Sequence, residues 1–245
     1  MTSAIASFHD AALAERLTIT RRGTAYFAQR LTELADDEFD AQTLLPGWSR
    51  RHVVAHIGYN AAALCRLMDW AATGVETPMY ESGEQRAHEI DTGARAAPAA
   101  LRQSFFRTAN QLDSKWRHHP QLAWSAVVRT AQGRQVPASE AVWLRAREVW
   151  IHAVDLATTG GFTDFPPLVT QTLLDDIVAF WRVKGTGAGL VLAVTDREPI
   201  SVDPQSEGGT TVTGSLPAVT RWAAGRGAVG VTFSGGSRIT PPPWL

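Results

Sequence analysis

The chain has 245 residues, of which 44% are hydrophobic and 19% charged, so it can bury a sizeable core and is not expected to be disordered. Lysine and arginine number 23 against 24 aspartates and glutamates, and a net charge of −1 argues against a nucleic-acid partner. The single cysteine, Cys65, excludes an intrachain disulfide and a cysteine-rich structural zinc site.

The first two-thirds of the sequence predicts four long helices. Apolar residues recur at helical spacing in each, and Ser49 stands where an N-cap belongs at the start of the second. The helices are expected at residues 11–34, 49–74, 98–117 and 137–160. A polar segment at 76–92 is expected to be a connection with a short helical piece. Four helices of this kind predict a bundle, whose interior is a common place for metal sites.

The sequence changes in character after Gly161. One more helix is expected at residues 166–184, followed by glycine-rich turns, β-type runs and a short helix at 216–224. The β-type runs are residues 189–194, 210–214 and 230–233. We therefore expect a mainly α chain with two domains, a helical one at 1–162 and a small α+β one at 163–245.

Neither end of the sequence predicts a targeting or membrane segment. The N-terminal residues lack a basic stretch followed by an apolar core, and no run approaches the ~18 apolar residues of a membrane span. The proline-rich tail at 241–245 is too stiff for a helix or a central strand. We expect a cytoplasmic protein that does not contact a membrane.

Ligand-type side chains occur at helical spacing on the second and fourth helices. Glu148 and His152 are four residues apart, so they share one helix face, roughly 5–6 Å apart at Cβ. His56 lies on the apolar stripe of the second helix. If the two helices pack together, two imidazoles and a carboxylate converge, and such a set with an open fourth position is what catalytic zinc needs. The spacing equally allows Glu148 to pair with Arg145 or Arg147 and His152 to be a hydrogen-bonded core histidine.

Other polar residues have an alternative, structural interpretation. Asp155 is either an acceptor that holds an imidazole tautomer or an ordinary helix carboxylate, and Asn60 is a second candidate for such support. Cys65 lies among apolar helix residues and is expected to be a buried, inert thiol. The remaining histidines of polar segments and helix ends are expected to be exposed: His9, His88, His118 and His119.

Arg226 is the most suggestive charged residue of the second domain. It lies between two glycines in AAGRG (223–227), where a guanidinium could bind a carboxylate bidentately or simply face solvent from a turn. The sequence has no phosphate-binding loop, no nucleophile elbow and no HExxH or CxxC motif. The glycine-rich run at 185–189 precedes a strand instead of a helix, so it lacks the helix N-terminus that phosphate binding uses.

Several short runs resemble one family over nearly the whole chain, that of the mycothiol-dependent maleylpyruvate isomerases in the DinB-like superfamily. The runs are LPGWS (45–49), AHIGYN (55–60), TAQGR (130–134), REVWIHAVDL (147–156), GSL (214–216), AAGRG (223–227) and the terminal proline-rich WL (244–245). The resemblance implies a DinB-like four-helix bundle followed by a small α/β domain similar to sterol-carrier-like folds. It also implies a zinc ion held by His56, Glu148 and His152, and a functional arginine at Arg226.

The implied reaction is the mycothiol-dependent cis–trans isomerisation of maleylpyruvate to fumarylpyruvate, in gentisate-type degradation of aromatic compounds. A zinc-activated thiolate would add reversibly to the conjugated double bond. One alternative is a zinc- and mycothiol-dependent S-transferase that detoxifies electrophiles and consumes the thiol. A second is a non-enzymatic module with a closed structural zinc site, in which His52 is the fourth ligand and the second domain binds an apolar ligand.

Overall fold

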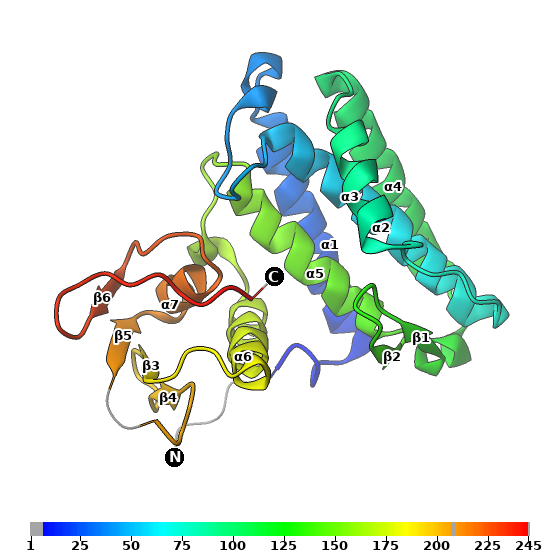
Figure 1. Ribbon diagram of the computed structural model, residues 1–245. Helices are drawn as coiled ribbons and strands as arrows, with labels where there is room; N and C mark the ends of the chain where they lie inside the picture. The colour runs from blue at the N-terminus through cyan, green and yellow to red at the C-terminus, as the bar shows by residue number, and fades with distance from the viewer. Residues whose placement is uncertain (1–6, 207–208, 245) are drawn as a thin grey trace. The chain divides into compact units, whose positions relative to one another are not determined.

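The computed structural model describes residues 7–206 and 209–244, which form two compact units (Figure 1). One unit is Ala12–Gly160, and the other is the chain from Gly161 onward together with the N-terminal segment up to Ala11. The sequence assigns this N-terminal segment to the helical domain instead. Phe8 accounts for the difference, because its side chain is fully buried and its backbone N–H donates to Thr172 Oγ1 at 2.7 Å.

The unit of residues 12–160 is a helical bundle, as the sequence predicts. The four long helices begin and end within a few residues of the expected positions, and the helical piece expected in the polar segment is also present. The helices are α1 (Leu13–Thr32), α2 (Arg50–Thr73), α3 (Gly83–Gly93), α4 (Pro98–His118) and α5 (Glu140–Asp155). Short 3₁₀ turns at Asp36–Asp40 and Gln121–Ser125 join them. A hairpin of β1 (Val127–Arg129) and β2 (Gln135–Pro137) was not predicted.

Helix α2 is central to the bundle and carries His56, one of the three candidate metal ligands. It packs along α4 and α5, while α1 packs along α5 (Figure 1). At its start the backbone N–H of Ser49 donates to His52 Nδ1 at 3.2 Å, and it ends at Gly74, whose φ of 75° is left-handed. Its inner face buries Ile57 and Leu64 completely. Because α2 and α5 are neighbours, residues 90 positions apart in sequence can meet between them.

The close approach of α1 and α5 depends on Gly23. A Cβ atom at this position would lie 2.5 Å from Trp150 Nε1 and 2.8 Å from Val149 Cγ2. Overpacking of this kind costs about 1–3 kcal/mol, against the ~1 kcal/mol that alanine gains over glycine in a helix. We therefore expect Gly23→Ala to lower the free energy of unfolding by up to about 2 kcal/mol, measured by urea denaturation of the chelator-treated protein with circular dichroism.

Gly58→Ala is the matched control for this substitution. Gly58 is also inside a helix of the bundle, but a Cβ there would lie 3.8 Å from the hydroxyls of Ser104 and Thr108, which is ordinary contact. We expect this variant to be as stable as the parent or up to about 1 kcal/mol more stable. Equal stability of the two glycine variants would show that the α1–α5 contact does not require glycine.

The C-terminal unit is α+β, as predicted. Its helices are α6 (Pro167–Lys184) and α7 (Leu216–Ala223), after a 3₁₀ turn at Phe162–Asp164. Among the described residues four strands pair in the order β4-β3-β5-β6, with β3 and β5 parallel and the other pairs antiparallel. The strands are β3 (Leu190–Val194), β4 (Ile200–Ser201), β5 (Thr210–Gly214) and β6 (Val231–Phe233). The two-residue β4 was not predicted, since it is too short to show a pattern.

Two buried tryptophans fix the proline-rich tail. The indole N–H of Trp181 donates to the carbonyl of Pro242 at 3.0 Å, and that of Trp222 donates to Ile239 at 3.1 Å. As expected, the tail forms neither helix nor strand up to Trp244; Leu245 lies outside the described residues.

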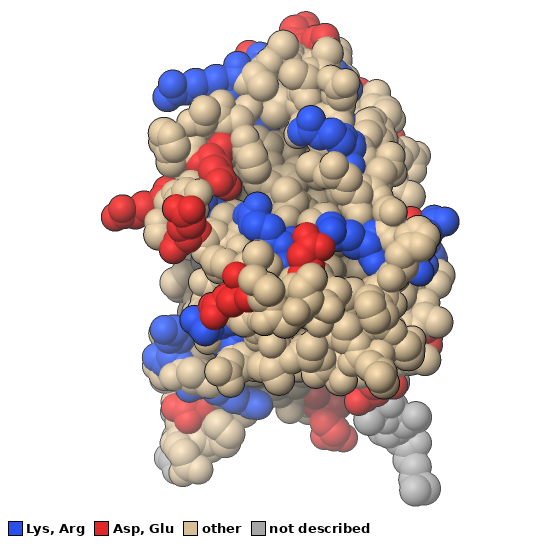
Figure 2. Space-filling view, turned by 90° about the vertical axis from the view of Figure 1, so that its right-hand side faces the viewer, with Lys and Arg blue, Asp and Glu red and all other residues tan. Residues whose placement is uncertain are grey.

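The molecular surface mixes charges of both signs. Figure 2 shows lysine and arginine side chains interspersed with aspartates and glutamates over the face that it presents. The bundle helices also carry ion pairs, such as Arg117 with Asp113 at 2.7 Å. Within the described parts of the chain, no helix is both long and apolar enough to cross a membrane.

Candidate metal centre

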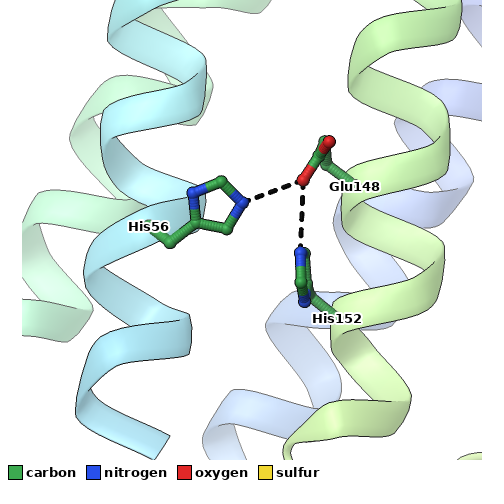
Figure 3. Close-up of side chains that lie close together, drawn as sticks. All are labelled: His56, Glu148 and His152. Atoms are coloured by element: carbon green, nitrogen blue, oxygen red, sulfur yellow. Dashed lines mark hydrogen bonds and ion pairs between the residues drawn. The ribbon is translucent and has the colours of Figure 1, made fainter. Parts of the chain in front are cut away.

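The packing of α2 against α5 brings His56, Glu148 and His152 together. Glu148 Oε2 lies 2.8 Å from His56 Nε2 and 3.2 Å from His152 Nε2, so one carboxylate oxygen faces both imidazoles (Figure 3). The possible ligand atoms of the three residues all lie within 4.8 Å of one another. The two histidines are buried and the Glu148 side chain is 13% exposed. Two nitrogens and one oxygen therefore converge at one point inside the bundle.

Glu148 also takes part in the ion pair that the sequence left open. Its outer oxygen, Oε1, lies 3.5 Å from Arg147 Nε, so the ion pair and the histidine cluster coexist. Arg145 does not contact the carboxylate. It is 1% exposed and donates at 2.8 Å to the carbonyl of Ile57 and to Asn60 Oδ1. Asn60 thus holds a buried arginine and supports no imidazole.

Asp155 orients one of the two imidazoles. Its side chain is fully buried, and its Oδ2 lies 2.8 Å from His152 Nδ1. This contact fixes the ring so that Nε2 points toward Glu148. Metal-binding histidines typically donate their second N–H to a carboxylate in this way. Of the two interpretations of Asp155, the structure favours the orienting acceptor.

The three cluster residues have different pKa shifts. Burial lowers the pKa of His56 to about 4, an effect that its hydrogen bond to Glu148 only partly opposes. Burial alone would raise the pKa of Glu148, but hydrogen bonds from His152 and His56 outweigh it and hold that pKa well below the ordinary value. Burial alone would also lower the pKa of His152, yet its hydrogen bonds to Asp155 and Glu148 raise it. At neutral pH the cluster therefore holds an anionic carboxylate and a neutral His56.

Trp48 forms an aromatic wall beside the cluster. Its ring is nearly parallel to that of His152, with centroids 6.4 Å apart, and meets His56 edge-on at 5.4 Å. The same ring stacks on His52 at 6.3 Å. The sequence did not single out Trp48 as a site residue; its position directly before the helix that carries His56 was the available signal.

His52 lies outside the metal-ligand cluster. Its Nδ1 is 2.8 Å from Ser49 Oγ, and its Nε2 lies 3.8 Å from a carboxylate oxygen of Asp91. Both ring nitrogens are thus turned to the start of α2 and to α3. The geometry gives no support to His52 as a fourth ligand.

The remaining sequence candidates are mostly where they were expected. Cys65 is buried, and burial raises the pKa of its thiol to about 11. His9, His88 and His118 are exposed. The prediction for His119 was wrong: the ring is half-buried against Trp124, with centroids 4.7 Å apart, because the 3₁₀ turn after α4 folds back over it.

Arg226 is buried in the C-terminal unit. Its side chain is 8% exposed and donates through one terminal nitrogen to the carbonyl of Ala224 at 2.6 Å, while Arg221 donates to the carbonyl of Arg226 at 2.8 Å. The alternative of a solvent-facing turn arginine is therefore wrong. A guanidinium is rarely buried without a structural or binding role.

Comparisons with known proteins point to one family. The family model of the mycothiol maleylpyruvate isomerase N-terminal domain matches residues 20–157, which is more than half of the chain. A solved structure described as a mycothiol-dependent maleylpyruvate isomerase is 46% identical, with a TM-score of 0.95 over 98% of this chain and 100% of that chain. A histidine-to-alanine mutant of a mycothiol-dependent maleylpyruvate isomerase gives the same values. No curated protein sequence matches significantly.

Proposed function

Because this chain belongs to the mycothiol maleylpyruvate isomerase family, we propose that it is an isomerase that converts maleylpyruvate to fumarylpyruvate with mycothiol as thiol cofactor. The observation that carries the proposal is the buried cluster of His56, Glu148 and His152 in a chain 46% identical to such an isomerase over its full length. The substrate is a small carboxylate, in keeping with gentisate-type degradation of aromatic compounds.

The donor set fits zinc as the metal. Two imidazoles and one carboxylate are the ligands of open catalytic zinc sites, which keep a position for an exogenous ligand. Glu148 is ionised, His56 is neutral, and Asp155 holds His152 with Nε2 directed inward, so three lone pairs can face one ion. We propose that His56, Glu148 and His152 hold zinc. When bound, zinc supplies the positive charge that keeps a coordinated thiol deprotonated at neutral pH.

The reaction requires a thiol that this chain does not itself supply. Rotation about a carbon–carbon double bond needs a temporary loss of bond order, and bound mycothiol supplies the thiolate that adds to the conjugated system and leaves again. Cys65 cannot take this role, because it is buried and its pKa of about 11 leaves it protonated at neutral pH. An external thiol fits these properties.

The chain's own residues hold the reacting groups in place. Asp155 fixes the ring of His152, and the Trp48 indole packs beside both imidazoles. Glu148 neutralises positive charge inside the bundle. A guanidinium matches a carboxylate bidentately, so we propose that Arg226 binds a carboxylate of the substrate.

A single set of measurements tests the proposed function. The purified protein is analysed for metal, and maleylpyruvate turnover is assayed without thiol, with catalytic mycothiol and with stoichiometric mycothiol. We expect about one zinc per chain and many turnovers per mycothiol, because isomerisation returns the thiol. Consumption of one mycothiol per product would instead identify an S-transferase, and zinc without turnover under any condition would indicate a structural site.

Replacement of Arg226 separates substrate binding from metal binding. We expect Arg226→Ala to retain zinc and to lose at least about tenfold in kcat/KM for maleylpyruvate, since a hydrogen-bonded charge pair contributes about 1.5–3 kcal/mol. The matched control is Arg238→Ala, an exposed arginine of the same unit, which should leave kcat/KM unchanged. An Arg226 variant with the parent's kcat/KM would remove this residue from the site.

A further inference from the structure

Arg86, on α3, has no carboxylate partner although it lies beside the metal-ligand cluster. One terminal nitrogen of its guanidinium is 3.3 Å from His56 Nδ1, and the group lies 5.8 Å from the centroid of the Tyr80 ring. Across residues 7–206 and 209–244, no aspartate or glutamate forms an ion pair with it. Several other arginines of the bundle pair with a carboxylate, as Arg51 does with Asp40 at 2.6 Å. A half-buried guanidinium that hydrogen-bonds Tyr80 but has no carboxylate partner suits an anionic ligand at a candidate site.

The contact with His56 does not account for the role of Arg86 in the metal-bound protein. A histidine that holds a metal through Nε2 carries a proton on Nδ1 and donates it to an acceptor. A guanidinium offers donors only, so Arg86 cannot be that acceptor. The contact belongs to the metal-free state, in which His56 Nδ1 accepts. With a ligated imidazole, the guanidinium is left free to hydrogen-bond elsewhere at the same edge of the site.

Tyr80 and Arg66 keep this region in place. Arg66 lies 5.7 Å from the centroid of the Tyr80 ring, and its Nε donates to the carbonyls of Pro78 and Met79 at 3.1 and 3.0 Å. Two arginines thus contact one tyrosine, but only Arg66 is anchored to the backbone. Burial raises the pKa of Tyr80, so its hydroxyl stays protonated at neutral pH; it hydrogen-bonds Arg86 but carries no negative charge to offset the guanidinium. The arrangement supports Arg86 without neutralising it.

We infer that Arg86 binds a carboxylate of the substrate beside the metal centre and sets the preference for anionic substrates. The inference rests on the proposed function, because maleylpyruvate supplies the carboxylates. It adds a specificity-determining residue in the helical unit. The role of Arg86 does not depend on Arg226.

The test compares Arg86→Ala, Arg86→Lys and Arg95→Ala in the zinc-loaded protein. Arg95 is an exposed arginine just after α3 and serves as the matched control. We expect Arg86→Ala to raise KM for maleylpyruvate at least about tenfold, with zinc content and KM for mycothiol unchanged. Arg86→Lys should recover part of the loss, because lysine keeps the charge but not the planar fork.

Calorimetric binding of maleate, a simple dicarboxylate, gives a readout independent of turnover. We expect maleate to bind the parent and Arg95→Ala equally and to bind Arg86→Ala at least about tenfold more weakly. The inference is overturned if maleate does not bind the parent or binds Arg86→Ala equally well. A KM change for mycothiol alone, or loss of zinc from both Arg86 variants, would also overturn it. A parent without isomerase activity that binds maleate through Arg86 would refute only the proposed function.

Discussion

Glu148→Gln is expected to remove bound zinc and isomerase activity together. Glutamine keeps the size of the side chain but not the charge, and Glu148 Oε2 is the oxygen that faces both imidazoles. Changes in outer partners of a metal site already cost about 10–100-fold in affinity. We expect the loss of a direct anionic ligand to cost more than about 100-fold in zinc affinity, and to lower kcat/KM by roughly 10²–10³-fold, in line with the 3–5 kcal/mol for breaking a buried charge pair.

The control for this variant is Glu140→Gln, on the same helix. Glu140 lies in the first turn of α5, 3.9 Å from Arg134 and outside the cluster, so this variant should keep zinc and activity. Zinc per chain is measured by mass spectrometry after dialysis, and folding is checked by circular dichroism. His56→Ala and His152→Ala should lose zinc and activity as well. Parent-like zinc content in all three cluster variants would refute the ligand assignment.

Zinc affinity is expected to fall about tenfold per pH unit as the pH drops below the pKa of His152. That pKa is raised above its ordinary value of 6.5, so the ring is protonated below it and must lose a proton before it can bind metal. His56, with a pKa of about 4, is already neutral across this range and adds no competing proton. Glu148 is ionised throughout. One proton should therefore be released for each zinc bound below the His152 pKa, and this release should cease well above it.

The measurement is a competition titration with a chromophoric chelator from pH 5 to pH 8. Calorimetry in two buffers of different ionisation enthalpy counts the protons released. The observation that would contradict the prediction is a release of two protons near pH 6, because it would require both imidazoles to be charged in the metal-free protein.

Asp155→Asn tests whether Asp155 raises the pKa of His152. Asparagine lacks the charge that raises the pKa of His152, so proton competition should begin at a lower pH than in the parent. Well above the pKa of His152, where no proton competes, the same variant should bind zinc about 10–100-fold more weakly, because the imidazole has lost its orienting acceptor. At low pH the weaker proton competition raises the zinc affinity of the variant, while the loss of the orienting acceptor lowers it. Loss of folding would only lower the zinc affinity.

Much of the fold could be predicted from the sequence because helical periodicity is a local property. The long helices, and the strands of three to five residues in the C-terminal unit, follow from apolar spacing, capping residues and glycine-rich turns. The two-residue β4 is too short to leave a pattern, and the hairpin of β1 and β2 was not predicted. Residues 7–11 group with the C-terminal unit because Phe8 hydrogen-bonds Thr172. These two residues are 164 positions apart, and a contact over such a distance leaves no local signal in the sequence.

For the candidate site too, local spacing could be read from the sequence and long-range contacts could not. The facing of Glu148 and His152 is dictated by their spacing on one helix, and the apolar stripe of α2 already turned His56 inward. Only the tertiary structure decided that α2 lies against α5, that Asp155 holds His152, and that Arg86 stands beside His56 without a carboxylate. It also decided the charge states, since pKa values depend on burial and on partners brought from distant segments. A sequence specifies which face of a helix is buried, whereas the neighbour that buries it is chosen by packing of the whole core.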